Sequence, residues 1–280
     1  MPCMKTTDGT FLFYEDWGAG APVVLLHGWG VSCDMWEYQV PALTEGGLRC
    51  LAYDRRGSGR SDRPGTGYDY DSLAEDLSEL LRHLDLREVT LVSHSMGGGE
   101  VVRYLAKHGQ DRVARVALIS PTLPFLLRTG DNPDGVDGGT LEHIVDALRA
   151  DRPGFLAGMA AGALGTELPG TSVSDAMVQW AMGLFHSGSA QAAHACLRTH
   201  WESDLRADLA ALSVPTLIVH GTHDALVPAE HTSLRLPGAI PDAELRMYEN
   251  ASHWLFVTHK ERLNADLLAF CGASSGSSGA

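Results

Sequence analysis

The sequence predicts an α/β fold in which a mostly parallel central sheet carries helices on both faces and a helical lid inserted above it. Short runs of apolar and β-branched residues, such as residues 22–26 and 89–92, indicate strands that are buried on both faces. These runs alternate with helical patterns, as in parallel sheets whose strands are joined by crossover helices. Between residues 121 and 207 the strand signals stop, and helical patterns follow one another.

Taken in order, the elements begin with an antiparallel hairpin over residues 6–17 that turns at Asp8-Gly9. Strands are then expected at residues 22–26, 49–53, 89–92, 113–119, 215–221 and 244–248. Helices are expected at residues 35–43, 71–84, 100–105 and 261–270, and within the insertion at 141–149, 155–164, 175–185 and 191–201. This pattern predicts a core at residues 1–120 and 208–272, a helical lid at 121–207, and a flexible Ser/Gly tail at 273–280 outside the fold.

Charge and cysteine content limit the classes of function. The 280 residues carry a formal net charge of −14, which argues against nucleic acid or an anionic membrane as a partner. Five scattered cysteines form no C-x-x-C pair and the first residues lack the apolar core of a signal peptide, so a cytoplasmic protein is expected. The thirteen histidines include no H-E-x-x-H pair, and His194 and His200 are poorly spaced for one helix face, so we expect no metal and no other cofactor.

The stretch around Ser95 carries the strongest catalytic signal. Ser95 falls in the sharp turn between the strand at 89–92 and the helix at 100–105. In such a turn a serine is held in a strained conformation with its hydroxyl exposed, and small residues are needed two positions before and after it. Ser93 and Gly97 meet that need. The alternative is a glycine-rich connection that only lets the helix pack closely.

A serine hydroxyl needs a base within hydrogen-bond reach and an acid that orients the base. Asp224 and His253 each follow a predicted strand, so both are expected at the carboxyl edge of the sheet together with Ser95. Singly, Asp224 could be a turn residue and His253 a helix cap or surface histidine. Three further histidines are weaker candidates for the base: His94 is expected to pack beneath the turn, His220 lies inside a strand, and His223 is expected to point away.

An oxyanion hole needs two backbone N–H groups aimed at the oxygen that becomes negative. We expect one from Met96, which follows the nucleophile, and one from Trp29 in the loop after the strand at 22–26. The indole of Trp29 is also expected to form pocket wall, and His27 to support the loop.

With these motifs identified, the chain resembles the α/β-hydrolase superfamily, and more closely its group of cofactor-free haloperoxidases, aryl esterases and lactonases. The resemblance spans nearly the whole chain outside the lid and is carried by residues 27–29, 53–62, 93–101, 204–209, 214–221, 227–228 and 250–253, together with Asp224. It implies an α/β-hydrolase fold and a Ser-Asp-His triad. Two residues depart from the group: Ser93 stands where Gly is usual, and Gly30 stands where the peracid-forming members have Pro.

The resulting hypothesis is a serine hydrolase whose small-molecule substrates are carboxylic esters or lactones, with Ser95 as nucleophile, His253 as base and Asp224 as the orienting acid. Candidate substrate contacts are apolar: Trp29, Phe125, Met159, Trp180, Phe185 and Trp254. Most of those in the lid could instead be lid core. A serine nucleophile excludes the haloalkane-dehalogenase and epoxide-hydrolase variants, which need a carboxylate.

Other functions remain open at this point. They are C–C bond or amide hydrolysis, cofactor-free perhydrolase or haloperoxidase activity, and ligand binding with residual hydrolysis. The sequence does not decide whether the chain forms a homo-oligomer.

Overall fold

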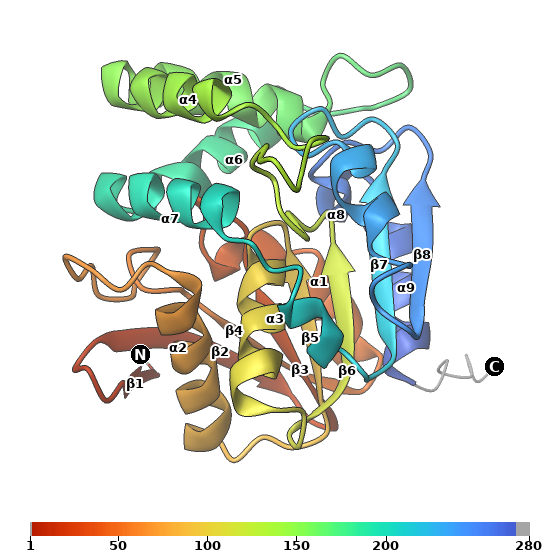
Figure 1. The fold of residues 1–280 in the computed structure, drawn as a ribbon. Helices are drawn as coiled ribbons and strands as arrows, with labels where there is room; N and C mark the ends of the chain where they lie inside the picture. The colour runs from red at the N-terminus through yellow and green to blue at the C-terminus, as the bar shows by residue number, and fades with distance from the viewer. Residues whose placement is uncertain (1, 273–280) are drawn as a thin grey trace.

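The computed structural model describes residues 2–272, so the predicted tail at 273–280 lies outside the described residues. Eight strands form one sheet in the order β1-β2-β4-β3-β5-β6-β7-β8 (Figure 1). The strands are β1 (Cys3–Lys5), β2 (Phe11–Gly18), β3 (Ala21–Leu26), β4 (Leu48–Tyr53), β5 (Val89–His94), β6 (Val113–Ile119), β7 (Thr216–Gly221) and β8 (Ala243–Tyr248). The strand β2 pairs antiparallel with β1 and β4, as the predicted hairpin requires, and the other pairs are parallel.

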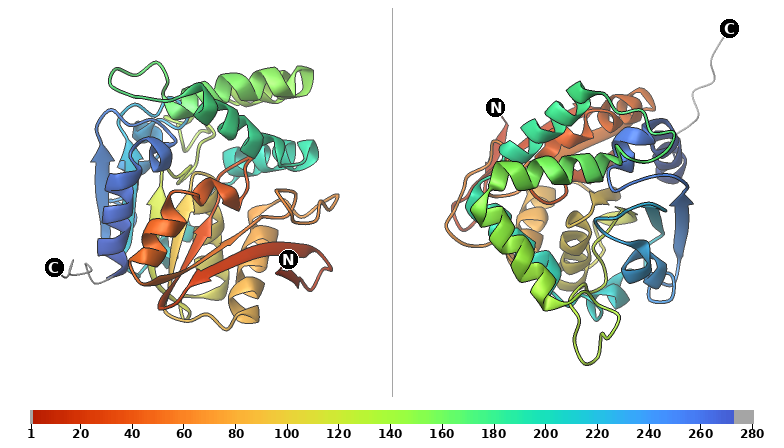
Figure 2. Two further views of the ribbon diagram at one scale, coloured as in Figure 1. Left: turned by 180° about the vertical axis from the view of Figure 1, so that it is seen from behind. Right: turned by 90° about the horizontal axis from the view of Figure 1, so that it is seen from above.

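The central strands are the apolar runs of the sequence, and every residue of β5 and β7 is buried. A parallel strand covered on both faces exposes no side chain to water, which explains why these segments lack a polar alternation. The covering helices of the core are α1 (Gln39–Glu45), α2 (Tyr70–His83), α3 (Gly97–His108), α8 (Leu255–Thr258) and α9 (Lys260–Cys271). The helices α2 and α3 pack together on one face, and α1 and α9 on the other (Figures 1 and 2).

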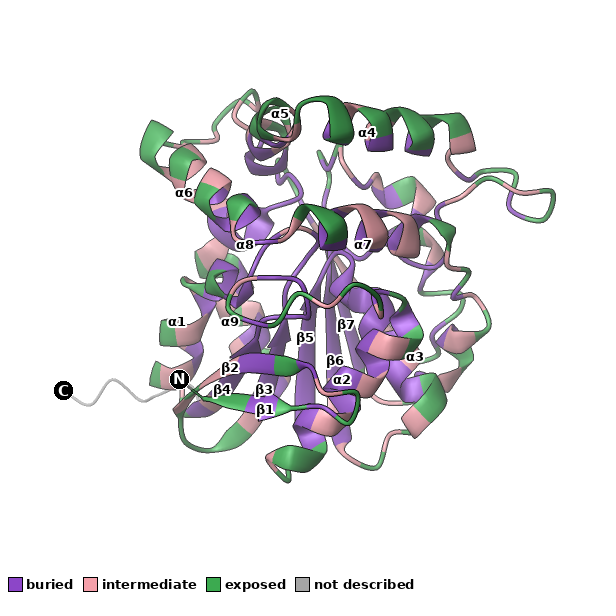
Figure 3. Ribbon diagram, turned by 90° about the vertical axis from the view of Figure 1, so that its left-hand side faces the viewer, coloured by how far each residue is buried: buried purple, intermediate pink, exposed green. Residues whose placement is uncertain are grey.

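The lid leaves the sheet after β6 and returns at β7. It contains α4 (Gly138–Ala150), α5 (Arg152–Leu164), α6 (Asp175–His186) and α7 (Ala190–Glu202), all within the predicted insertion. These helices lie above the carboxyl ends of the parallel strands, with exposed outer faces and buried inner faces (Figures 1 and 3). Before α4 the chain forms an irregular loop with two isolated bridges, Leu127–Val136 and Thr129–Asn132.

Two details differ from the predicted elements. The expected helix at 35–43 is divided into a short 3-10 helix, η1 (Cys33–Trp36), and α1. Pro41 lies in the first turn of α1, where its missing N–H is not needed, so a helix running through it from residue 35 would lose a hydrogen bond. Short 3-10 helices also appear at η2 (Asp208–Ala211), η3 (Ala229–His231) and η4 (Ser233–Arg235), where no pattern indicated them. Within residues 2–272, no helix combines the length and apolar character needed to cross a bilayer.

Candidate active site

Ser95 occupies the turn between β5 and α3 with a φ of 54°, in the left-handed region that a non-glycine residue rarely adopts. Its N–H donates to Ile119 O at 2.9 Å and its carbonyl accepts from Gly98 N at 3.0 Å, so the strained turn is fixed on both sides. A Cβ on Gly97 would lie 3.1 Å from Leu26 O, which explains the small residue at that position. This geometry is that of a nucleophile elbow.

Asp224 and His253 are joined by a hydrogen bond of 2.7 Å between Asp224 Oδ2 and His253 Nδ1. The other carboxylate oxygen accepts from the backbone N–H groups of Leu226 at 3.1 Å and Val227 at 2.8 Å. His220 Nε2 lies 3.2 Å from Asp224 Oδ2. Burial by itself raises the pKa of Asp224, but His253 and the hydrogen bond from His220 hold that pKa well below its usual range. Asp224 is therefore an anion that fixes the His253 ring.

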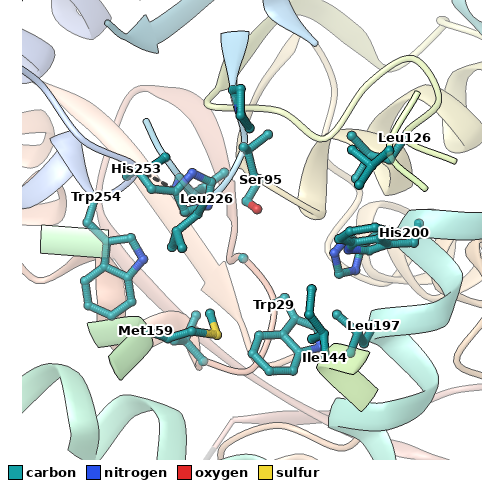
Figure 4. A pocket seen from close by; sticks show the side chains of 18 of the residues that line it. Trp29, Ser95, Leu126, Ile144, Met159, Leu197, His200, Leu226, His253 and Trp254 are labelled. Carbon is teal, nitrogen blue, oxygen red and sulfur yellow. Dashed lines mark hydrogen bonds between the residues drawn. The ribbon is translucent and has the colours of Figure 1, made fainter. Parts of the chain in front are cut away.

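Ser95 and His253 line the same cavity (Figure 4). In residues 2–272 the hydrogen bonds include none between Ser95 Oγ and His253. Catalytic hydrogen bonds of free enzymes are often long and tighten when substrate binds, so the arrangement is compatible with proton transfer between the two groups.

His94 contacts His253 directly, which the sequence did not indicate. Its ring lies 4.7 Å from the His253 ring between centroids, and its Nε2 lies 3.0 Å from His253 O. Because a carbonyl only accepts, Nε2 carries the hydrogen. Burial and the neighbouring His253 lower the pKa of His94 well below its ordinary value. His94 therefore holds the backbone of His253 as a neutral ring, in addition to packing beside the elbow.

Both predicted oxyanion donors lie near Ser95. Met96 follows it directly, and the loop of Trp29 passes so close that a Cβ on Gly28 would lie 3.5 Å from Ser95 Cβ. Within the described residues, neither the Met96 nor the Trp29 backbone N–H donates a hydrogen bond. Two N–H groups without partners beside a candidate nucleophile are what an oxyanion hole requires.

Arg55 fixes the loop that carries Trp29. Its backbone N–H donates to His27 Nε2 at 2.9 Å, and its guanidinium donates to His27 O at 2.9 Å and to the buried carboxylate of Glu100 at 2.8 Å. His27 thus supports the loop, as expected. The charged pair was not predicted, because Arg55 and Glu100 are 45 positions apart and only the fold brings them together.

The cavity has a volume of about 460 Å³ and lies between the sheet edge and the lid. It is lined by Gly28, Trp29, Val31, His94, Ser95, Leu126, Val136, Thr140, Ile144, Phe155, Met159, Phe185, Leu197, His200, Trp201, Ala225, Leu226, Val227, Pro228, His231, His253 and Trp254. The lining is predominantly apolar, which suits a small substrate with a hydrophobic body.

Four of the six predicted substrate contacts line this cavity, namely Trp29, Met159, Phe185 and Trp254. Phe125 and Trp180 do not, and that part of the prediction is corrected. Phe125 lies beneath the guanidinium of Arg206, 5.3 Å from the ring centroid. Trp180 packs edge-on against Tyr38 and Trp254, outside the cavity. Trp180 is in α6 and Phe125 in the loop before α4. An apolar residue of the lid can face either the cavity or another part of the protein, and the sequence pattern does not separate the two.

The lid also forms hydrogen bonds with the loop that carries His253. Ser252 Oγ donates to Gly162 O at 2.7 Å, and Trp254 N donates to Ala163 O at 2.8 Å. These carbonyls belong to the last turn of α5, where carbonyls lack the N–H four residues later in the helix. Gly162 O also accepts from the C-cap N–H of Gly165 at 3.1 Å. The residues on both sides of His253 are therefore bound to the lid.

One cluster outside the cavity resembles a metal site in composition. Glu15, Cys33 and Asp34 place potential ligand atoms close together. Arg60 already interacts with all three, at 3.3 Å from Glu15 Oε1, 3.1 Å from Cys33 Sγ and 2.7 Å from Asp34 Oδ1. Burial raises the pKa of the Cys33 thiol, which disfavours the thiolate that binds metals. The cluster is better explained as a charged network around Arg60.

The fold and the site define an enzyme of the α/β-hydrolase class. The chain belongs to the alpha/beta hydrolase fold family, which matches residues 21–260. It is 40% identical over 276 residues to a protein named non-heme chloroperoxidase CPO-A1 from Kitasatospora aureofaciens, covering 96% of this chain and 99% of the relative. Within the superfamily it resembles the cofactor-free haloperoxidase and esterase group.

Two solved structures support this placement. A bromoperoxidase from Bacillus anthracis superposes with a TM-score of 0.91 at 38% identity, covering 97% of this chain and all of the other. The esterase EaEST from Exiguobacterium antarcticum also gives a TM-score of 0.91, at 31% identity, covering 96% of this chain and 98% of the other. Both esterases and haloperoxidases are thus found among the similar proteins.

Proposed function

We propose that the protein is a serine hydrolase that cleaves small carboxylic esters or lactones through an acyl-enzyme. The observation that carries the proposal is the 2.7 Å bond between Asp224 and His253 beside a cavity into which Ser95 is presented at a φ of 54°. This combination supplies a nucleophile, a base and an orienting acid in one place.

In the proposed reaction, Ser95 Oγ attacks the substrate carbonyl and its proton passes to His253 Nε2. The carbonyl oxygen becomes negative and receives hydrogen bonds from the N–H groups of Trp29 and Met96. When the C–O bond breaks, His253 returns the proton to the departing alkoxide. Water, deprotonated by His253, then attacks the acyl-enzyme, and the acid leaves as Ser95 regains its proton. In a lactone the alkoxide is part of the same molecule, so a hydroxy acid is released.

The test joins active-site labelling with a substrate panel. A fluorophosphonate should modify Ser95 and no other serine, as read by mass spectrometry of the labelled peptide, and the Ser95→Ala variant should not be labelled. Aryl esters, alkyl esters and lactones of rising acyl length should be hydrolysed, whereas amides and β-diketones should be poor substrates. Labelling at Ser93 or Ser252, or faster turnover of amides or diketones, would contradict the proposal. Binding of such compounds without turnover would favour a ligand-binding protein.

Perhydrolysis is a second candidate, favoured by the haloperoxidase names of the relatives. The residue after Trp29 is relevant to peroxide chemistry. The peracid-forming members of the group that this chain resembles have Pro at this position, where this chain has Gly30. Gly30 has a φ of 73°, whereas proline is confined to a φ near −65°. A proline here would require a different loop, so we propose that water attack exceeds peroxide attack in this protein.

The measurement is bromination of monochlorodimedone with acetate and hydrogen peroxide, beside hydrolysis of p-nitrophenyl acetate in the same preparation. We expect clear hydrolysis and weak bromination. Bromination as fast as hydrolysis would favour a perhydrolase. The positive φ also means that a Gly30→Pro variant would distort the loop, so that variant is not an informative test of peroxide chemistry.

A further inference from the structure

His200 is a polar side chain on an otherwise apolar part of the cavity wall. It belongs to α7, is 8% exposed, and its ring points into the cavity on the side away from His253 (Figure 4). Leu126, Ile144 and Leu197 are the labelled residues around it in that view. A polar group that is buried among apolar side chains costs free energy unless it obtains a hydrogen bond, so its position calls for an explanation.

The contacts of the His200 ring define what it offers to a ligand. Nδ1 lies 2.7 Å from Cys196 O, one turn earlier in α7, and since a carbonyl only accepts, Nδ1 carries the hydrogen. Burial lowers the pKa of His200 to about 4, so the ring is neutral near pH 7. Nε2 is then an acceptor, and within residues 2–272 it has no hydrogen-bond partner.

The other polar side chains of the cavity wall differ from His200 in their access to water or in their proposed role. Thr140 is exposed and His231 is half-buried, so water can satisfy both. Ser95, His94 and His253 belong to the catalytic arrangement described above. His200 is therefore the buried acceptor, among the described cavity residues, that has no other function.

We propose that His200 determines specificity by accepting a hydrogen bond from a hydroxyl or N–H group of the substrate, so that the preferred esters or lactones carry such a donor. This inference rests on the proposed function, because it concerns the substrate of the Ser95 site. A purely apolar cavity would prefer a methoxy group to a hydroxyl, whereas an acceptor at Nε2 reverses that preference.

The experiment compares esters that differ only in the donor. Methyl 3-hydroxybutanoate is paired with methyl 3-methoxybutanoate, and methyl 6-hydroxyhexanoate with methyl 6-methoxyhexanoate, and hydrolysis is followed by pH-stat at pH 7.5. In at least one pair we expect the wild type to favour the hydroxy ester in kcat/KM by about tenfold, the size of one hydrogen bond. In His200→Phe the ratio should fall to about one or below.

His194→Phe is the matched control. His194 lies on the same helix and makes the same contact one turn back, with Nδ1 2.7 Å from Ala190 O, but it does not line the cavity. Its variant should keep the wild-type ratio. His200→Leu is the second variant if the larger Phe ring disturbs the lid, and the ratio is independent of the active fraction of each preparation.

Each outcome decides the inference. Equal or lower kcat/KM for the hydroxy esters of the wild type in both pairs would overturn it, as would an unchanged ratio in the His200 variants or an equal loss in His194→Phe. If the wild type hydrolyses the methoxy and hydroxy esters alike, only the role of His200 fails. If no ester is hydrolysed and Ser95 is not labelled, the proposed function fails, and this inference with it.

Discussion

Ser95, Asp224 and His253 all follow strands at the carboxyl edge of the sheet, whereas the opposite wall of the cavity comes from lid helices α4, α5, α6 and α7. The edge residues are held by the strand register, the strained turn and a buried network that includes the pair of Arg55 and Glu100. The lid helices are half-exposed along their length (Figure 3). In the proposed function, the reacting groups therefore belong to the sheet edge, and much of the wall that would contact the substrate belongs to the lid.

Several hydrogen bonds nevertheless connect the two regions, and three of them lie at the candidate site. The indole of Trp29 donates to Ala193 O of α7 at 2.8 Å, and Ser252 and Trp254 donate to carbonyls at the end of α5. The lid therefore contacts both the loop of Trp29 and the loop of His253.

Replacing residues 121–207 by the lid of a relative should change the substrate preference. Fluorophosphonate labelling should stay intact only if the carbonyls at 162–163 are kept in place.

The largest effect is expected at His253, the proposed base at the sheet edge. His253→Ala should lower kcat for p-nitrophenyl acetate by roughly 10⁴-fold or more, because it removes the proposed base and the members of a triad act as a unit. His223→Ala is the control, since His223 is exposed and bonds to Thr222. A collapse of kcat in the control, or near wild-type kcat in His253→Ala, would contradict the assignment.

Asp224→Asn should lower kcat by as much as His253→Ala or by less, roughly 10³–10⁴-fold. His253 remains in this variant but loses the anion that fixes its Nδ1–H. The folded protein should form, since the amide oxygen can still accept from Leu226 N and Val227 N. Circular dichroism checks the fold and steady-state kinetics the rate. Activity within a few-fold of wild type would show that another group orients His253.

The pH dependence of stability should report the burial of His200 as a neutral ring. The pKa of His200 is lowered from 6.5 to about 4 by burial, so the unfolded chain binds its proton first. Stability from this group is full above pH 6.5 and is lost as pH falls toward 4, by up to about 1.4 kcal/mol per pH unit. His200→Phe should reduce that slope in urea titrations between pH 7 and 4.5. The same slope in both proteins would contradict the burial of a neutral ring.

A cavity-wall substitution in the lid should change preference without changing chemistry. Met159→Ala enlarges the cavity, and kcat/KM for longer acyl esters should rise relative to acetate by roughly three- to tenfold. The rate of fluorophosphonate labelling should stay near that of the wild type. Met177→Ala is the matched control, because Met177 is a half-buried lid methionine that does not line the cavity. Equal changes in both variants would place specificity elsewhere.

The smallest effect is expected where the lid meets the base. Ser252→Ala removes the hydrogen bond to Gly162 O, and kcat should fall by roughly two- to tenfold as the His253 loop loses one attachment. KM for a short ester should change little. A fall in kcat as large as that of Asp224→Asn would mean that Ser252 has a catalytic role of its own.

Local sequence patterns were sufficient to predict the strands, the elbow and the identity of the candidate triad. Apolar runs set the strands, and Ser95, Asp224 and His253 each follow one closely. Parallel strands end at a common edge, so local order along the chain already implies that these three residues meet. The hairpin, the parallel core and the helical insertion were predicted from the same periodic patterns, because the number of buried faces of an element sets the spacing of its apolar residues.

Which side chains face one another could not be predicted from these patterns and became visible only in the folded chain. The exclusion of Phe125 and Trp180 from the cavity, the inward position of His200 and the contact of His94 with His253 depend on how helices and loops pack. The sequence shows a glycine at position 30, but its φ of 73° exists only in the folded loop. Helix rotation, loop conformation and contacts between distant residues are set by packing of the whole chain, so no local pattern encodes them.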